Sequence, residues 1–185
     1  MSTIRIEPLQ VEDFEIFVHY LNDHLRDNGQ SDTGYFQPMP CAASQVSPER
    51  AARFLQALQT PMNQPGWRRA WVARNAATGA IAGHVDLRAH LEAHTEHRCL
   101  LGLGVDRQHR QQGLARQLLG QAQSWARGEA GLSHIDLHVL SSNRPALKLY
   151  ESLGFIVVGE WPDMFRIDGH RLDYTAMALA LQPPS

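Results

Sequence analysis

The 185-residue sequence has only two cysteines, Cys41 and Cys99, and they stand far apart in the chain. Two distant thiols exclude a disulfide framework as the basis of the fold, and a reducing compartment is the default. The sequence also lacks any apolar run of membrane-spanning length, and its first residues lack the apolar core of a signal peptide. We therefore expect a cytoplasmic protein with no membrane partner.

An excess of charge of either sign is missing as well. The 17 Lys and Arg residues nearly balance the 19 Asp and Glu residues, which leaves a formal net charge of −2. Nonspecific nucleic-acid binding needs a basic face, so we expect no nucleic-acid partner. No repeat or low-complexity linker divides the chain, and we expect residues 1–185 to form a single domain.

Apolar residues follow two spacings along the chain, alternation typical of strands and a three-to-four spacing typical of helices. The expected strands are Thr3–Pro8, Trp67–Arg74, Ala80–Arg88, Leu100–Val105, Ile135–Leu140, Phe155–Trp161 and Arg171–Leu181. The expected helices are Val11–Asp27, a segment from Ser47 to before Pro61, a segment from Gly113 to about Gly128, and Asn143–Leu153. This order, β-α-α-β-β-β-α-β-α-β-β, predicts an α+β fold with a mixed central sheet flanked by helices.

The stretch LLGLGVDRQHRQQGLAR, residues 100–116, leads from a strand through a basic turn into a helix. The first N–H groups of a helix have no intrahelical partner, and the helix dipole adds partial positive charge there. Gly113 has no Cβ, so an anion can approach its backbone closely. Arg107, Arg110 and Arg116 place full charges nearby. The stretch therefore predicts a cradle for a pyrophosphate.

Two common pyrophosphate motifs do not fit this turn. The dinucleotide-binding motif needs a third glycine where Arg107 stands, and the P-loop needs a Gly-Lys-Ser/Thr ending. The turn reads Arg110-Gln111-Gln112-Gly113-Leu114-Ala115. It resembles the Arg/Gln-x-x-Gly-x-Gly/Ala signature of the GNAT superfamily of N-acetyltransferases, in its bacterial type. In that family this loop holds the pyrophosphate of acetyl-CoA.

A second stretch, Asn143–Phe155, resembles the Asn-x-x-Ala-x-x-x-Tyr helix of the same family, which ends in Gly-Phe. Asn143 can cap the helix, and Gly154 can end it in the left-handed conformation. The resemblance implies that Asn143 contacts the pantetheine arm and that Tyr150 is catalytic, protonating the departing thiolate. A helix cap and a core aromatic are the structural alternatives for these two residues.

The resemblance also implies acetyl-CoA as the acyl donor. In the family the sheet splays beside the strand at residues 100–105, and the pantetheine arm pairs with that strand. Glycine within the strand, at Gly102 and Gly104, indicates a bulge or a close backbone approach. The expected cofactor-binding residues are Leu103, Val105, Arg110, Gln111, Gln112, Gly113, Leu114, Ala115, Asn143 and Tyr150.

The implied reaction is transfer of an acetyl group to a primary amine of a small molecule, peptide or protein, by direct attack on the thioester. Leu100 stands where many relatives carry a glutamate that acts as the base. Asp86, His84, Glu96 and His97 remain open as substitutes. The missing glutamate keeps a second function open, a noncatalytic module that binds acyl-CoA.

A histidine cluster at His90, His94 and His97, with Cys99 beyond, raises a third function, a metal-dependent hydrolase. The spacing is not that of the zincins, and on a strand these residues would not share one face. We therefore expect no metal.

The acceptor cleft is expected to form from the loops Asn28–Ala43, which carries Tyr35 and Phe36, and Trp161–Arg166. The aromatic pair equally fits a role in anchoring its loop to the core. A homodimer is compatible with the sequence, although no residue requires one.

Overall fold

The structure is a computed structural model that describes residues 4–181, so Thr3 of the first expected strand lies outside the described part. The strands are β1 (Ile4–Pro8), β2 (Arg68–Asn75), β3 (Ile81–Arg88), β4 (Arg98–Val105), β5 (His134–Leu140), β6 (Ile156–Ile167) and β7 (His170–Ala180). The helices are α1 (Phe14–Leu25), α2 (Pro48–Gln59), α3 (Leu114–Gly128) and α4 (Arg144–Ser152), with short 3-10 helices at Val11–Asp13, Cys41–Ala43 and Arg107–His109. The expected order of strands and helices is confirmed.

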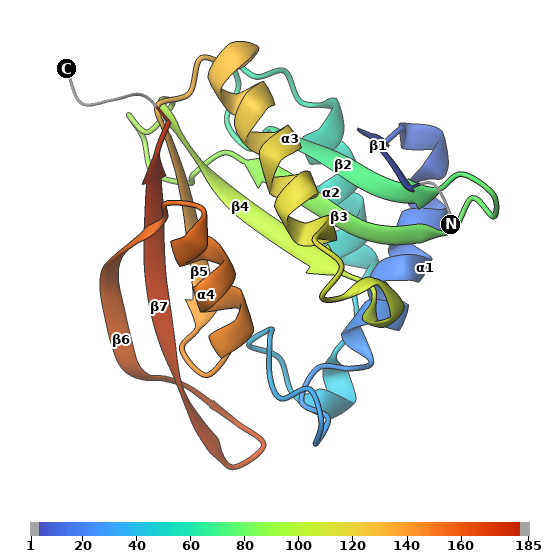
Figure 1. Ribbon diagram of the computed structural model, residues 1–185. Helices are drawn as coiled ribbons and strands as arrows, with labels where there is room; N and C mark the ends of the chain where they lie inside the picture. Colours follow the sequence, from blue (N-terminus) through green and yellow to red (C-terminus); the bar gives the residue numbers. More distant parts are fainter. Residues whose placement is uncertain (1–3, 182–185) are drawn as a thin grey trace.

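The described strands form one sheet in the order β1-β2-β3-β4-β5-β7-β6. β4 and β5 run parallel, whereas every other neighbouring pair runs antiparallel. In Figure 1, α3 and α4 cover the face of the sheet toward the viewer, and α1 and α2 lie behind it. The prediction of a mixed sheet flanked by helices is therefore confirmed.

The core has one apolar layer on each face of this sheet. In β2, Trp71 and Ala73 pack into the layer that includes α3 and α4. Their neighbours Ala70 and Val72 pack into the layer that includes α1 and α2. Successive strand residues point to opposite faces, so a central strand covered on both sides is apolar throughout.

The last hairpin differs from the expected one, because β6 continues to Ile167 instead of ending at Trp161. The prediction that Trp161–Arg166 forms a loop is therefore wrong. The pairing with β7 shifts register between Trp161 and Phe165, where Asp163 has a φ of 51°, and then resumes. β6 lies at the edge of the sheet. Pro162 has no N–H group to donate, but on the side of β6 without a partner strand no hydrogen bond is lost.

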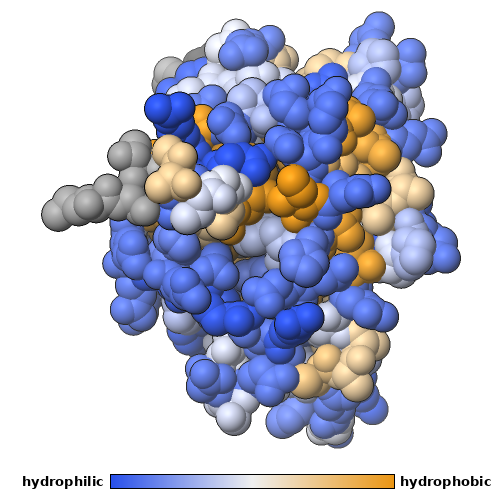
Figure 2. All heavy atoms as spheres, turned by 90° about the vertical axis from the view of Figure 1, so that its right-hand side faces the viewer, coloured by the Kyte–Doolittle hydropathy of each residue, from blue (hydrophilic) through white to orange (hydrophobic). Residues whose placement is uncertain are grey.

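Figure 2 views the molecule from the side on which β1 lies in Figure 1. This surface is largely hydrophilic, with hydrophobic residues gathered in a band near its middle and along one side. Within residues 4–181, no helix has both the length and the apolar character needed to span a bilayer.

Candidate active site

β4 and β5 separate within the sheet. They pair only from Arg98 to Leu100 on β4, and β5 then continues alongside β7. Figure 1 shows the two strands diverging from that point. Within the described residues, β4 from Leu101 to Val105 therefore has a strand partner on its β3 side alone. Unpaired strand backbone readily binds an extended chain, and the two residues expected to contact the pantetheine arm, Leu103 and Val105, lie on this stretch.

The loop after β4 ends in an open helix terminus. Gln111 and Gly113 both adopt left-handed conformations, with φ of 60° and 78°, and α3 begins at Leu114. A Cβ on Gly113 would have no described heavy atom within 4 Å, so its backbone faces open space. The first amides of α3 have no intrahelical acceptors. This geometry suits a phosphate approaching the backbone.

Two of the arginines in this loop turn away from the helix terminus. Arg107 donates to Asp23 and Asp27 of the α1 region, with Nε 3.1 Å from Asp27 Oδ2. Arg110 donates to Asp27 Oδ2 at 2.9 Å and to the Val105 carbonyl at 3.2 Å. In this structure both guanidinium groups are therefore paired with aspartates of the α1 region. They fasten the loop to α1, and the loop offers an anion mainly its backbone N–H groups.

α4 places Asn143 and Tyr150 as the sequence pattern predicts. Asn143 Oδ1 accepts from the Ala146 amide at 3.3 Å, which confirms the helix cap. Tyr150 is 8% exposed, and its ring lies against Phe155. Among the described residues its hydroxyl has no recorded hydrogen-bond partner, and burial raises its pKa far above the usual value. Tyr150 is therefore a neutral phenol.

The strand glycines make room for side chains of β3, which explains the close approach expected there. A Cβ on Gly102 would overlap the carboxylate of Asp86, which lies opposite it in the sheet. A Cβ on Gly104 would lie 2.5 Å from Cε1 of His84. The two glycines therefore allow polar groups to lie flat against β4, on the face that α1 and α2 cover.

His84 has a structural role at this position. Its Nδ1 lies 3.2 Å from the hydroxyl of Tyr20, and that hydroxyl donates to the Gly104 carbonyl at 3.3 Å. Burial lowers the pKa of His84 to about 4. An imidazole with so low a pKa is a weak proton acceptor at neutral pH, which argues against His84 as the base.

The other proposed substitutes for the base are scattered. Glu96 and His97 precede β4, at the end of that strand remote from the open turn. The described residues contain no group of three or more His, Cys, Asp or Glu side chains placed to hold a metal ion. In place of such a cluster, His90 Nε2 lies 2.9 Å from Asp136 Oδ2 on β5.

His138 of β5 is a further candidate, which was not among the residues expected in the site. It lies beyond the last residue of β5 that pairs with β4, and its ring stacks on Tyr174 at 5.3 Å and contacts Trp161. Its pKa is lowered by burial and by the positive charge of Arg88. The sequence does contain a signal for this position. His138 stands between Leu137 and Val139, which are buried core residues, so strand alternation points its side chain to the opposite face of the sheet.

The loop between α1 and α2 bends over to the β6–β7 turn. Asp168 Oδ2 accepts from the Tyr35 hydroxyl at 2.7 Å and from the Cys41 amide at 2.8 Å. Asn28 is fully buried at the base of the loop, where its side-chain amide bonds to five groups. Tyr35 thus anchors this loop to the hairpin, while the ring of Phe36 contacts His24.

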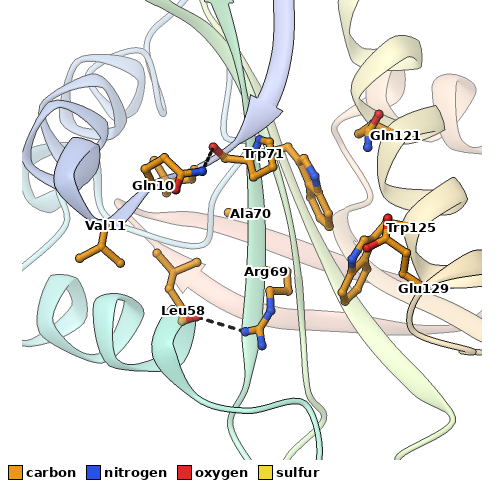
Figure 3. Close-up of a pocket in the computed structure, with 11 residues that line it drawn as sticks. Gln10, Val11, Leu58, Arg69, Ala70, Trp71, Gln121, Trp125 and Glu129 are labelled. Atoms are coloured by element: carbon orange, nitrogen blue, oxygen red, sulfur yellow. Dashed lines mark hydrogen bonds between the residues drawn. The ribbon is translucent and has the colours of Figure 1, made fainter.

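A separate hollow lies at the end of β1 and near the end of α2 (Figure 3). It is lined by Val11, Leu58, Trp71 and Trp125, among others. Arg69, one of its two charged lining residues with Glu129, donates to the Leu58 and Thr60 carbonyls and so satisfies the end of α2. This hollow therefore has a structural explanation.

Comparison with known proteins places these features in a wider group. The model of the acetyltransferase (GNAT) family matches residues 39–155. The catalytic subunit NAA10 of the N-terminal acetyltransferase A complex from Arabidopsis thaliana is 37% identical over 78 residues, which cover 42% of this chain. The match spans only 41% of that plant protein.

Two solved structures show the same fold over nearly the whole chain. The acetyltransferase of GNAT family from Streptococcus pneumoniae has a TM-score of 0.79 and 23% identity, covering 96% of this chain and 99% of that one. The yncA protein from Salmonella typhimurium, solved with its cofactor acetyl-CoA, has a TM-score of 0.78 and 20% identity, covering 100% and 97%.

Proposed function

The chain belongs to the acetyltransferase (GNAT) family, and from that premise we propose that it transfers the acetyl group of acetyl-CoA to a primary amine. The amine attacks the thioester directly. The opening between β4 and β5, which leads to the free amides at the start of α3, is the observation that supports this proposal most strongly. It offers extended backbone for the pantetheine arm and a helix terminus for the pyrophosphate at its end.

Different residues bind the cofactor, orient the thioester and transfer protons. The amides from Gln111 to Ala115 hold the phosphates, and the unpaired edge of β4 orients the thioester and stabilises negative charge developing on its oxygen. Tyr150 donates its hydroxyl proton to the departing thiolate, and its raised pKa keeps the phenol protonated before this transfer.

His138 takes the role that the glutamate replaced by Leu100 would fill. Its imidazole lies on the part of β5 that has separated from β4, and its lowered pKa keeps it neutral at pH 7. A neutral imidazole can accept a proton from the attacking amine, directly or through water. The acceptor is a primary amine of a small molecule, a peptide or a protein.

Release of free thiol from acetyl-CoA, measured with a panel of primary amines, tests the proposal. We expect amine-dependent release that falls at least tenfold in His138→Gln. His19→Gln, which changes an exposed histidine of α1, is the control and should retain activity. Saturable binding of acetyl-CoA without thiol release would favour the alternative, a noncatalytic acyl-CoA module. If the protein neither binds acetyl-CoA nor releases thiol from it, the proposal is overturned.

A further inference from the structure

Two arginines lie beside one buried carboxylate on the face of the sheet that α1 and α2 cover. Asp86 Oδ2 lies 3.2 Å from Arg68 Nε and 3.4 Å from Arg88 Nη1. Arg50 of α2 adds its positive charge to the field at Arg68. One negative charge therefore stands against three positive charges, and we call these four residues the arginine cluster.

The arginine cluster is short of hydrogen-bond acceptors as well as of negative charge. Arg68 Nε is buried, and although it lies within ion-pair distance of Asp86, it makes no hydrogen bond among the described residues. Its guanidinium stacks at 4.1 Å over the ring of Phe54. The 3.4 Å contact of Arg88 with Asp86 is long for a charge-assisted hydrogen bond. Burying donors without acceptors is costly, so an additional anion would stabilise this arrangement.

The position of the cluster links it to the acceptor. Asp86 and Arg88 lie opposite Gly102 and Leu100 of β4, where β4 and β5 part. A Cβ on Gly102 would lie 3.5 Å from Arg88 Nη1, so this guanidinium borders the backbone at which the thioester is proposed to lie. Its charge also acts on His138 and Tyr174 across the opening.

We propose that the arginine cluster binds a carboxylate of the acceptor, which makes the acceptor a free amino acid whose amine lies beside its carboxylate. This inference rests on the proposed acetyltransferase function and narrows its substrate class. Arg88 binds the carboxylate and the charge of Arg50 strengthens the attraction, while Arg68 remains with Asp86 and keeps that buried side chain neutralised. A guanidinium fork matches the two oxygens of a carboxylate, which gives the acceptor a fixed orientation.

Steady-state acetylation of matched acceptors tests this inference. The probes are the common L-amino acids and their carboxamides, which keep the amine and lose the negative charge. We expect kcat/KM, corrected for the fraction of free amine, to be at least tenfold higher for the acids than for the amides. Arg88→Gln and Arg50→Gln should each raise KM for the acids at least fivefold and lower the acid-to-amide ratio of kcat/KM by the same factor. Arg53→Gln, which removes an exposed guanidinium of α2 outside the cluster, should change neither.

Each other outcome decides the question. Equal rates for acids and amides overturn the carboxylate site and leave the proposed acetyltransferase function intact. Acetylation confined to peptides, or acetyl-CoA binding with neither probe acetylated, overturns the assignment to free amino acids. Failure to bind acetyl-CoA at all removes the proposed function itself. The Arg50 variant guards against misfolding, because that side chain is exposed and its one recorded hydrogen bond is to the Met39 sulfur.

Discussion

Tyr150 tests the proposed proton transfer at the scale of a single residue. Tyr150→Phe removes only the hydroxyl, which has no recorded partner among residues 4–181, so the fold should be retained. We expect kcat to fall about 100-fold, the usual contribution of a general acid, while the dissociation constant of acetyl-CoA changes less than about twofold. Single-turnover kinetics and calorimetry give the two values. Undiminished kcat would make Tyr150 a core aromatic.

One buried and one half-buried histidine, His84 and His24, make stability depend on pH. Burial lowers the pKa values of His84 and His24 to about 4, below the value of about 6.5 in an unfolded chain. Between pH 6.5 and pH 4 the unfolded state therefore binds more protons, so the free energy of unfolding falls as the pH falls. A shift of this size corresponds to about 3 kcal/mol per isolated histidine.

Urea unfolding measured from pH 7 to pH 4 checks this expectation. His84→Gln, which keeps a donor for Tyr20, should flatten the pH dependence, whereas the surface variant His19→Gln should follow the wild type. A wild-type stability that is constant across this range would contradict the neutral state of both imidazoles.

At the scale of elements, the contact between the α1–α2 loop and the β6–β7 turn depends on Asp168. Its carboxylate accepts from Tyr35 and from the Cys41 amide, and the hydrogen bond to Asp168 raises the pKa of Tyr35 to about 12. We expect Asp168→Ala to release the loop, so that the Cys41 amide exchanges its hydrogen at least tenfold faster. Asp32→Ala, within the same loop, is the control. Unchanged exchange would mean that Asn28 alone holds the loop.

The sequence predicts strands and helices well where the apolar period is clear, and it predicts the helix cap at Asn143 and the left-handed Gly154. It fails where distant segments decide the outcome. The partners of Arg107 and Arg110 lie in and after α1, about 80 residues earlier, so the basic turn resembles a phosphate-binding patch until α1 is placed. The same holds for Trp161–Arg166, where a proline and an aspartate suggest a loop but an edge strand tolerates both.

At the scale of the whole molecule, a net charge of −2 conceals an uneven distribution of charge. The arginine cluster concentrates positive charge at the opening, while aspartates of the α1 region neutralise the arginines of the loop before α3. The amino-acid composition therefore indicates neither the arginine cluster nor the neutralised arginines of the loop before α3. Both arise because the sheet brings β3, β4 and β5 together and then separates the last two.

Calorimetric titration with acetyl-CoA is the decisive experiment, because we propose that the opening and the free amides of α3 form the cofactor site. The account predicts saturable binding at one site per chain, abolished in Gly113→Val. Gly131→Val is the matched control, because Gly131 also has a positive φ and open space around it but lies after α3. It should bind as the wild type does. No binding by the wild-type protein, or equal binding by Gly113→Val, would contradict the account.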